Sequence, residues 1–112
     1  MTRYAGGADF EREVRAALVA DGYEIVVRSA GSKTKVDLVA IKAGQVLIVQ
    51  CKRNGVCPPA ERAAVLHIAS LLPGVGVPIV ASRPRVTYRR LTGPGPKDWV
   101  PFTTDEIEEV AS

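Results

Sequence analysis

Apolar and polar positions in the middle of the chain predict two adjacent β-strands. Residues 36–41 and 46–52 are both rich in valine, leucine and isoleucine, which fit well on a pleated, buried surface. The four residues 42–45 between them include Gly44, which can adopt the positive φ of a tight connection. The pattern therefore predicts a β-hairpin whose successive side chains project to opposite faces.

Two other stretches have the periodicity of helices. Residues 9–21 place their apolar side chains on one stripe and are followed by Gly22, which suits the end of a helix. Residues 58–72 start with two prolines, which suit a first helical turn, and are apolar nearly all round. A helix of this kind must be covered on both sides, so we expect a homodimer contact through it. Alternatively, basic loops or the C-terminal tail cover its outer face.

The remaining apolar segments predict three more strands, at residues 23–29, 77–82 and 85–92. Pro78 places the second of these near an edge of the sheet, because proline lacks the N–H that a central strand uses. The order of elements predicts an α/β fold, with a mixed β-sheet of about five strands flanked by helices. We expect one domain over residues 1–97 and a short acidic C-terminal tail, 98–112, with a terminal helix.

The composition limits the class of protein. The chain has 112 residues, of which 46% are hydrophobic, and this is enough for one domain with its own core. It contains no apolar run of membrane-spanning length and no signal-peptide pattern at the N-terminus, so we expect no membrane association. Cys51 and Cys57 fit neither a disulfide framework nor a zinc pattern, which predicts two free thiols and a cytoplasmic location.

Charge is distributed unevenly along the chain. The formal net charge is +3, but residues 98–112 hold five acidic side chains and no Lys or Arg. Residues 1–97 therefore carry fifteen basic and seven acidic side chains. A basic body favours a polyanionic partner such as nucleic acid, although ordinary solubility charge would give the same composition.

Three polar residues of the predicted hairpin are candidates for chemistry. Asp37 is near the start of the first strand, and Gln50 and Lys52 project from one face of the second. An acid, an amide oxygen and an ammonium group suit a phosphodiester hydrolase that uses Mg²⁺, because hard cations prefer oxygen ligands. The alternatives are a surface ion pair of Asp37 with a nearby lysine and an ordinary polar edge strand. Gln50, however, follows an apolar run typical of a buried strand, where a polar group needs a partner.

Four segments carry a resemblance to a known family. They are Glu11-Arg12-Glu13, Arg-Ser-Ala-Gly-Ser at 28–32, Val-Asp-Leu-Val-Ala at 36–40 and Gln-Cys-Lys at 50–52. Through them the chain resembles the archaeal-type Holliday junction resolvases of the PD-(D/E)xK nuclease superfamily, over roughly residues 6–92. The resemblance implies a restriction-endonuclease-like core and a homodimer. It also implies a Mg²⁺-dependent endonuclease, in which Mn²⁺ can substitute, that cuts branched DNA at four-way junctions in DNA recombination and repair.

The resemblance also implies roles for individual residues. The catalytic residues would be Glu11, Asp37, Gln50, Lys52 and Ser32. The metal ligands would be Glu11, Asp37, Gln50 and the backbone carbonyl of Cys51. The DNA-binding residues would be Arg12, Arg28, Lys33, Lys35 and Arg53. Spacing alone does not choose Glu11 over Glu13 as the helix-borne acid.

Gln50 departs from the family pattern, which has a second carboxylate at this position. A neutral amide would hold Mg²⁺ more weakly, so Asp37 and Glu11 would supply all the negative charge. A Gln-x-Lys sequence also resembles the Mrr-like branch of the superfamily, which implies a second hypothesis, an endonuclease of duplex DNA. A third hypothesis is a DNA-binding module whose catalysis Gln50 has weakened.

Overall fold

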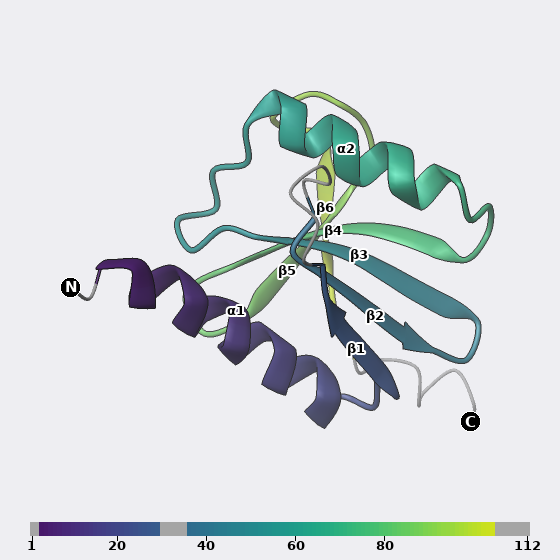
Figure 1. The fold of residues 1–112 in the computed structure, drawn as a ribbon. Coiled ribbons are helices and arrows are strands. Elements are labelled where there is room, and N and C mark those ends of the chain that lie inside the picture. Colours follow the sequence, from purple (N-terminus) through teal and green to yellow (C-terminus); the bar gives the residue numbers. More distant parts are fainter. Residues whose placement is uncertain (1–2, 30–35, 105–112) are drawn as a thin grey trace.

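The computed structural model describes residues 3–29 and 36–104, which form a six-stranded sheet between two helices (Figure 1). The helices are α1 (Arg3–Ala20) and α2 (Pro59–Ser70). The strands are β1 (Ile25–Arg28), β2 (Leu38–Lys42), β3 (Gln45–Cys51), β4 (Gly76–Ser82), β5 (Thr87–Leu91) and β6 (Trp99–Phe102). In this described part of the chain, neither helix is long and apolar enough to cross a membrane.

The strands follow one another across the sheet in the order of the sequence. Every neighbouring pair is antiparallel except β3 and β4, which are parallel. Parallel neighbours need a crossover connection, and α2 provides it by passing over one face of the sheet (Figure 1). The α/β class and the mixed sheet flanked by helices are confirmed, with six strands in place of about five.

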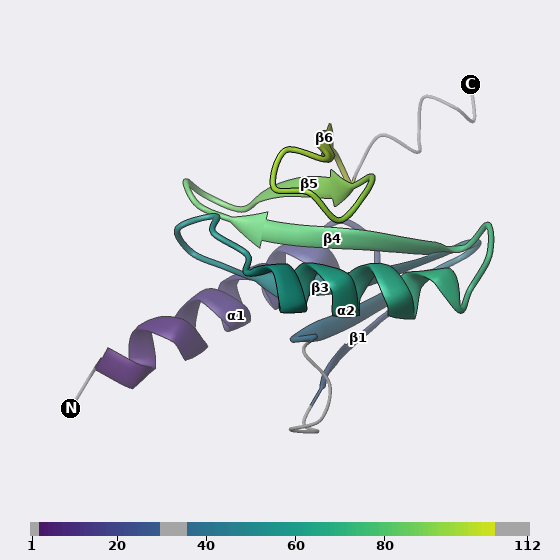
Figure 2. The same cartoon turned by 90° about the horizontal axis from the view of Figure 1, so that it is seen from above.

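Each helix buries an apolar stripe against a different face of the sheet (Figure 2). On one face, α1 inserts Phe10, Val14 and Leu18, which belong to the stripe predicted from the sequence. On the other face, α2 inserts Val65 and Ala69. Because side chains alternate along a strand, β3 contributes to both cores: Leu47 and Val49 on the α1 side, and Ile48 on the α2 side.

The predicted hairpin is confirmed as β2 and β3. The two strands are antiparallel, and Lys42 pairs with Gln45 across a tight turn. Gly44 in this turn has a φ of +76°, a conformation that glycine adopts without steric cost. At the other end of the hairpin Leu38 pairs with Val49, so the residues just before β2 lie beside the last residues of β3.

Pro78 was expected near an edge of the sheet, and this expectation is wrong. β4 lies between β3 and β5, and Pro78 is buried. β5 pairs only with residues 79–82 of β4, so at Pro78 one side of the strand has no neighbouring strand. On that side a missing N–H removes no hydrogen bond of the sheet, and proline is tolerated in an otherwise central strand.

β6 is a strand that the sequence pattern did not predict. It pairs antiparallel with β5 and lies at the edge of the sheet. Its sequence contains Pro101 and follows a stretch of glycines and prolines, which are signals of a loop. The sheet therefore continues past residue 97, where we expected the domain to end. The terminal helix expected near the C-terminus falls in 105–112, outside the described residues.

The helix predicted at 58–72 is confirmed as α2, but its outer face is not broadly apolar. The exposed residues on the helix are small or polar, and include Ala60, Ala63, His67 and Ser70. Alanine counts as apolar in a pattern, yet it buries little area and is a good helix former in water. Larger exposed apolar side chains gather just after the helix, at Leu71, Leu72 and Val75. A cover over the whole outer face is therefore not required, and the homodimer contact stays a prediction.

Candidate active site

Asp37 lies directly before β2, at the end of the sheet where β3 finishes. Its backbone carbonyl accepts a hydrogen bond from the N–H of Ser29 at 2.9 Å, which continues the pairing of β1 with β2. Its side chain reaches the neighbouring strand, where Oδ2 accepts a hydrogen bond from the backbone N–H of Cys51 at 2.8 Å. The hairpin thus fixes the carboxylate of Asp37 beside the segment 50–52.

Gln50 and Lys52 both contact one carboxylate, which lies on α2. Gln50 Nε2 donates a hydrogen bond to Glu61 Oε1 at 2.7 Å, and Lys52 Nζ forms an ion pair with the same oxygen at 2.6 Å. Glu61 belongs to the first turn of α2. Gln50 is only 5% exposed, so the expectation that it needs a polar partner in a buried strand is confirmed.

Asp37 shares its surroundings with several charged groups. Burial raises the pKa of its carboxyl group, and the nearby carboxylates of Glu11 and Glu61 also raise it. The Cys51 N–H and the ammonium of Lys52 oppose this rise but do not cancel it. Glu11, Lys52 and Glu61 therefore all lie within electrostatic range of one carboxylate, although they come from two helices and a strand.

The thiol of Cys51 is not suited to bind a metal ion beside Asp37. Burial raises its pKa, and the charges of Asp37 and Glu11 raise it further. The thiol therefore stays protonated at neutral pH, and a metal binds thiolate, not thiol. Cys51 and Cys57 are both free cysteines, as expected.

The oxygen atoms gathered here fit a hard divalent cation. Gln50 Oε1 is buried and has no hydrogen-bond partner within residues 3–29 and 36–104. An unpaired buried carbonyl oxygen costs about 1–3 kcal/mol, which a bound cation can offset. Asp37 and Glu11 add carboxylates whose mutual repulsion a cation would relieve. The described residues hold no cluster of three or more His, Cys, Asp or Glu suited to a metal, so a donor set here would have to include the amide oxygen.

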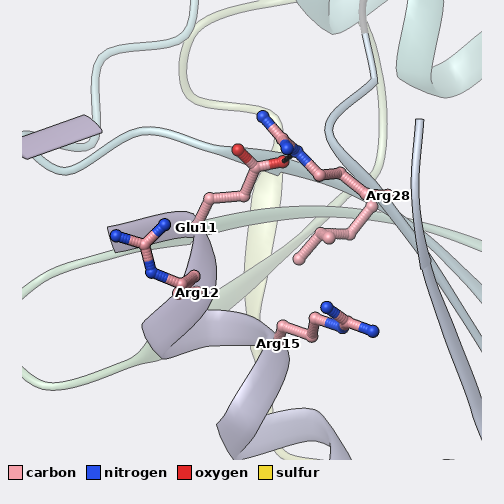
Figure 3. Close-up of a pocket in the computed structure, with 5 residues that line it drawn as sticks. Glu11, Arg12, Arg15 and Arg28 are labelled. Carbon is pink, nitrogen blue, oxygen red and sulfur yellow. Dashed lines mark hydrogen bonds and ion pairs between the residues drawn. The ribbon is translucent and has the colours of Figure 1, made fainter. Parts of the chain in front are cut away.

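Glu11 projects from α1 toward the guanidinium group of Arg28 (Figure 3). Its Oε2 lies 3.1 Å from Arg28 Nε, and its side chain is 18% exposed against 68% for the arginine. Glu13, the alternative that spacing left open, instead pairs with Arg83 at 3.0 Å. The charge of Glu11 also raises the pKa of the Asp37 carboxyl group, and this interaction favours Glu11 over Glu13 as the helix-borne acid.

A pocket of about 150 Å³ opens beside Glu11 (Figure 3). Its other lining residues are Arg12, Arg15, Arg28 and Leu38. Three guanidinium groups around one carboxylate make the pocket positively charged. Arginine binds phosphate oxygens through paired N–H donors, so the pocket suits a nucleic-acid backbone next to the candidate site.

Comparison with known proteins agrees with these observations. The family model described as archaeal Holliday junction resolvase (hjc) matches residues 2–57, half of the chain. The chain belongs to this family. A relative, the crossover junction endodeoxyribonuclease Hjc of Methanocaldococcus jannaschii, is 50% identical over 52 residues. These residues are 46% of this chain and 38% of the relative, so the chain spans well under half the length of the curated protein it matches.

A solved member of the resolvase family has a similar fold. The structure of Archaeoglobus fulgidus Hjc, a Holliday junction resolvase from an archaeal hyperthermophile, matches this chain with a TM-score of 0.59 and 24% identity. The match covers 76% of this chain and 70% of that chain. At this identity the likeness bears on the fold alone, and it confirms the restriction-endonuclease-like core expected from the sequence.

The match to the resolvase family covers only part of the candidate site. It includes Glu11, Asp37 and the segment 50–52, but it ends before Glu61. Glu61 and Arg15 are the residues of this site that sequence reasoning missed. Arg15 had a local signal, because it follows Glu11 by four residues and so shares its side of the helix. Glu61 had no local signal, since its contacts depend on how the chain returns after β3.

The DNA-binding residues expected from the resemblance are described only in part. Outside the described residues lie Ser32, Lys33 and Lys35. Arg12 and Arg28 line the pocket beside the candidate site, and Arg12 also pairs with Asp9 at 2.6 Å. Arg53 is exposed and lines a second pocket together with Lys52. Arginines therefore line both pockets that include candidate site residues, where a phosphate backbone could reach them.

Proposed function

We propose that this chain is a divalent-metal-dependent endonuclease that resolves four-way DNA junctions by phosphodiester hydrolysis. One observation supports this above all. Asp37 and the segment 50–52 lie together at one end of the hairpin, within electrostatic range of Glu11 and beside an arginine-lined pocket. The curated relative is named as a crossover junction endodeoxyribonuclease, but its match covers less than half of either protein.

The position of each residue suits a distinct role. When bound, Mg²⁺ or Mn²⁺ supplies Lewis-acid chemistry at the scissile phosphate and makes water more acidic. Asp37, Glu11 and the amide oxygen of Gln50 would hold the cation, with the backbone carbonyl of Cys51 as a further ligand. Lys52 would orient the attacking water or stabilise negative charge that develops on the phosphate.

The arginines would supply the DNA contact. Arg12, Arg15 and Arg28 would bind phosphates on one side of the scissile bond, and Arg53 would bind on the side of Lys52. The basic residues expected in the segment 30–35 would add to this contact. Phosphate contacts carry no direct sequence information, so recognition would rest mainly on the shape of the junction.

A homodimer suits this function because a four-way junction is cut on two symmetric strands. We expect the contact to use the C-terminal end of the helix predicted at 58–72, where Leu71, Leu72 and Val75 are exposed. A cytoplasmic, DNA-associated location stays a prediction.

The direct test is incubation of the purified protein with a labelled synthetic four-way junction and Mg²⁺, beside linear duplex of the same sequence. We expect paired nicks on two opposite strands of the junction, little cutting of the duplex, and no cutting by Asp37→Asn. Equal cutting of both substrates would support the Mrr-like duplex endonuclease instead. No cutting with Mg²⁺ or Mn²⁺, together with recovery in Gln50→Glu, would support a DNA-binding module with weakened catalysis.

A further inference from the structure

Glu61 stands in the first turn of α2, the helix that connects β3 to β4. Pro58 precedes the helix, and its carbonyl accepts a hydrogen bond from the Glu61 N–H at 3.0 Å. A carboxylate is favoured in this turn, because the N-terminus of a helix carries partial positive charge. The turn between β3 and α2 returns the chain so that the Glu61 side chain meets the last residues of β3.

A single oxygen of Glu61 binds both polar side chains of the Gln-x-Lys pair. Its Oε1 lies 2.7 Å from Gln50 Nε2 and 2.6 Å from Lys52 Nζ. Residues two apart on a strand project from the same face, so one carboxylate on the covering helix can reach both. The side chains of Lys52 and Glu61 are 27% and 25% exposed, which places the pair at the rim of the buried region.

The contact determines which way the amide of Gln50 faces. An ionised carboxylate accepts hydrogen bonds and donates none, so the amide must turn its NH₂ group toward Glu61. Its Oε1 then points away from Glu61, buried and without a partner in the described segments of the chain. Glu61 therefore holds Gln50 Oε1 in the orientation of an oxygen ligand, because a flipped amide would lose its hydrogen bond to the carboxylate.

Glu61 also changes the charge of the site. Gln50 is neutral, which leaves Glu11 and Asp37 as the acids expected from the sequence. Glu61 adds a third negative charge within hydrogen-bond distance of the Gln50 amide. More negative charge in a site gives tighter binding of a divalent cation.

We propose that Glu61 is a positioning residue that supplies, from α2, the negative charge that Gln50 does not carry, and that it orients Gln50 and Lys52 around a divalent cation. This inference rests on the proposed metal-dependent function. It has a specific consequence: the carboxylate can be exchanged between positions 50 and 61 with metal binding retained.

The alternative is an ordinary structural ion pair between Lys52 and Glu61. A partly exposed pair of this kind contributes little to stability, and it would leave metal affinity independent of Glu61. The alternatives therefore differ in metal binding measured without DNA, a property that does not depend on catalysis.

Titration of Mn²⁺ into the DNA-free protein distinguishes the positioning role of Glu61 from a structural ion pair. Binding is followed by calorimetry and by the electron paramagnetic resonance signal of free Mn²⁺. Glu61→Gln keeps the shape of the side chain and removes its charge, so we expect affinity to fall about 10- to 100-fold, as when groups that orient metal ligands are lost. Gln50→Glu combined with Glu61→Gln returns the carboxylate from β3, and should recover most of the affinity. The matched control is Glu24→Gln, an exposed carboxylate just before β1, which should bind Mn²⁺ as the wild type does.

Unchanged Mn²⁺ affinity in Glu61→Gln would overturn the inference, and so would a double variant that binds no better than the single variant. If circular dichroism shows that Glu61→Gln is unfolded, Glu61→Asp keeps the charge but withdraws the oxygen, and it must also weaken Mn²⁺ binding. A wild-type protein that binds no Mn²⁺ would count against this inference and against the proposed function together.

Junction cleavage by the same proteins separates the two proposals. Cleavage by the wild type, with Mn²⁺ affinity indifferent to Glu61, would refute the role of Glu61 and leave the proposed function standing. Mn²⁺ binding that depends on Glu61, with no cleavage of junctions by the wild type, would support the role of Glu61 and refute the proposed function.

Discussion

Asp37 Oδ2 accepts a hydrogen bond from the backbone N–H of Cys51 at 2.8 Å. This contact joins the residue before β2 to the last residue of β3, so the two strands of the hairpin cannot shift relative to each other without breaking it. It also leaves the second oxygen of the Asp37 carboxylate for other contacts. The hydrogen bond therefore explains how a short hairpin can hold an acid at a constant distance from its neighbours.

Asp37→Asn tests whether this carboxylate is needed for its charge. Asparagine can still accept the hydrogen bond from Cys51 through its amide oxygen, so the fold should be kept. The loss of negative charge should reduce junction cutting at least about a hundredfold, the upper end of the cost seen for groups that only orient a metal. Binding to the uncut junction, measured by gel shift, should remain. Full cleavage activity in this variant would reject Asp37 as a metal ligand.

The raised pKa of Asp37 predicts a pH dependence of stability in the metal-free protein. The folded state binds the proton of this carboxyl group more tightly than the unfolded chain does, because burial disfavours the charged form. The contribution of Asp37 to stability is therefore greatest below the ordinary aspartate pKa of about 4, and is lost as pH rises through the higher folded value. Relative to Asp37→Asn, the wild type should lose stability across that window.

Urea denaturation of both proteins in the presence of a chelator, from pH 4 upward, measures this difference. The subtraction cancels titration of the other carboxylates that the two proteins share. Parallel pH profiles would show that the folded protein does not perturb Asp37. Mn²⁺ binding should show the reverse trend and weaken as pH falls, because the cation binds only the ionised carboxylate.

The fold was predictable wherever a local pattern decides the structure. The hairpin follows from two apolar strands and a glycine turn, and the burial of Gln50 follows from the four apolar residues before it. β6 was not predictable, because Pro101 and its glycine-rich surroundings read locally as a loop. Its strand conformation comes from pairing with β5, which is a contact between distant parts of the chain.

The candidate site was predictable only in part, for a similar reason. Asp37, Gln50 and Lys52 lie on one hairpin, so their proximity follows from strand geometry. The resemblance supplied Glu11, and the structure distinguishes it from Glu13 by their different partners. Glu61 meets Gln50 only because α2 packs across β3, and no periodicity in the sequence encodes that placement.

Arg15→Ala tests the arginine-lined pocket. Arg15 is exposed on α1 and lines the pocket beside Glu11, so it is placed to bind a DNA phosphate. Its removal should weaken junction binding and lower the slope of log affinity against log salt concentration by about one. Fluorescence anisotropy at several salt concentrations measures both effects. The control is Lys97→Ala, an exposed cation in the loop before β6, which should leave the slope as in the wild type. If Arg15→Ala also leaves the slope unchanged, Arg15 does not contact the DNA.

Leu71→Asp tests the homodimer contact expected at the end of α2. Leu71 is 63% exposed and Leu72 is 38% exposed, so together they offer apolar surface that a second copy could bury. A charge placed at the centre of such a contact should weaken the dimer at least about tenfold, since loss of an interface hot spot commonly costs 2 kcal/mol or more. Sedimentation equilibrium of the wild type and the variant measures the change. Val19→Asp, at an apolar side chain on α1 that is 56% exposed, is the matched control and should not affect the dimer. Equal dissociation of the two variants, or a monomeric wild type, would argue against this contact. A monomeric variant that still nicks junctions on one strand would show that each active site works without its partner.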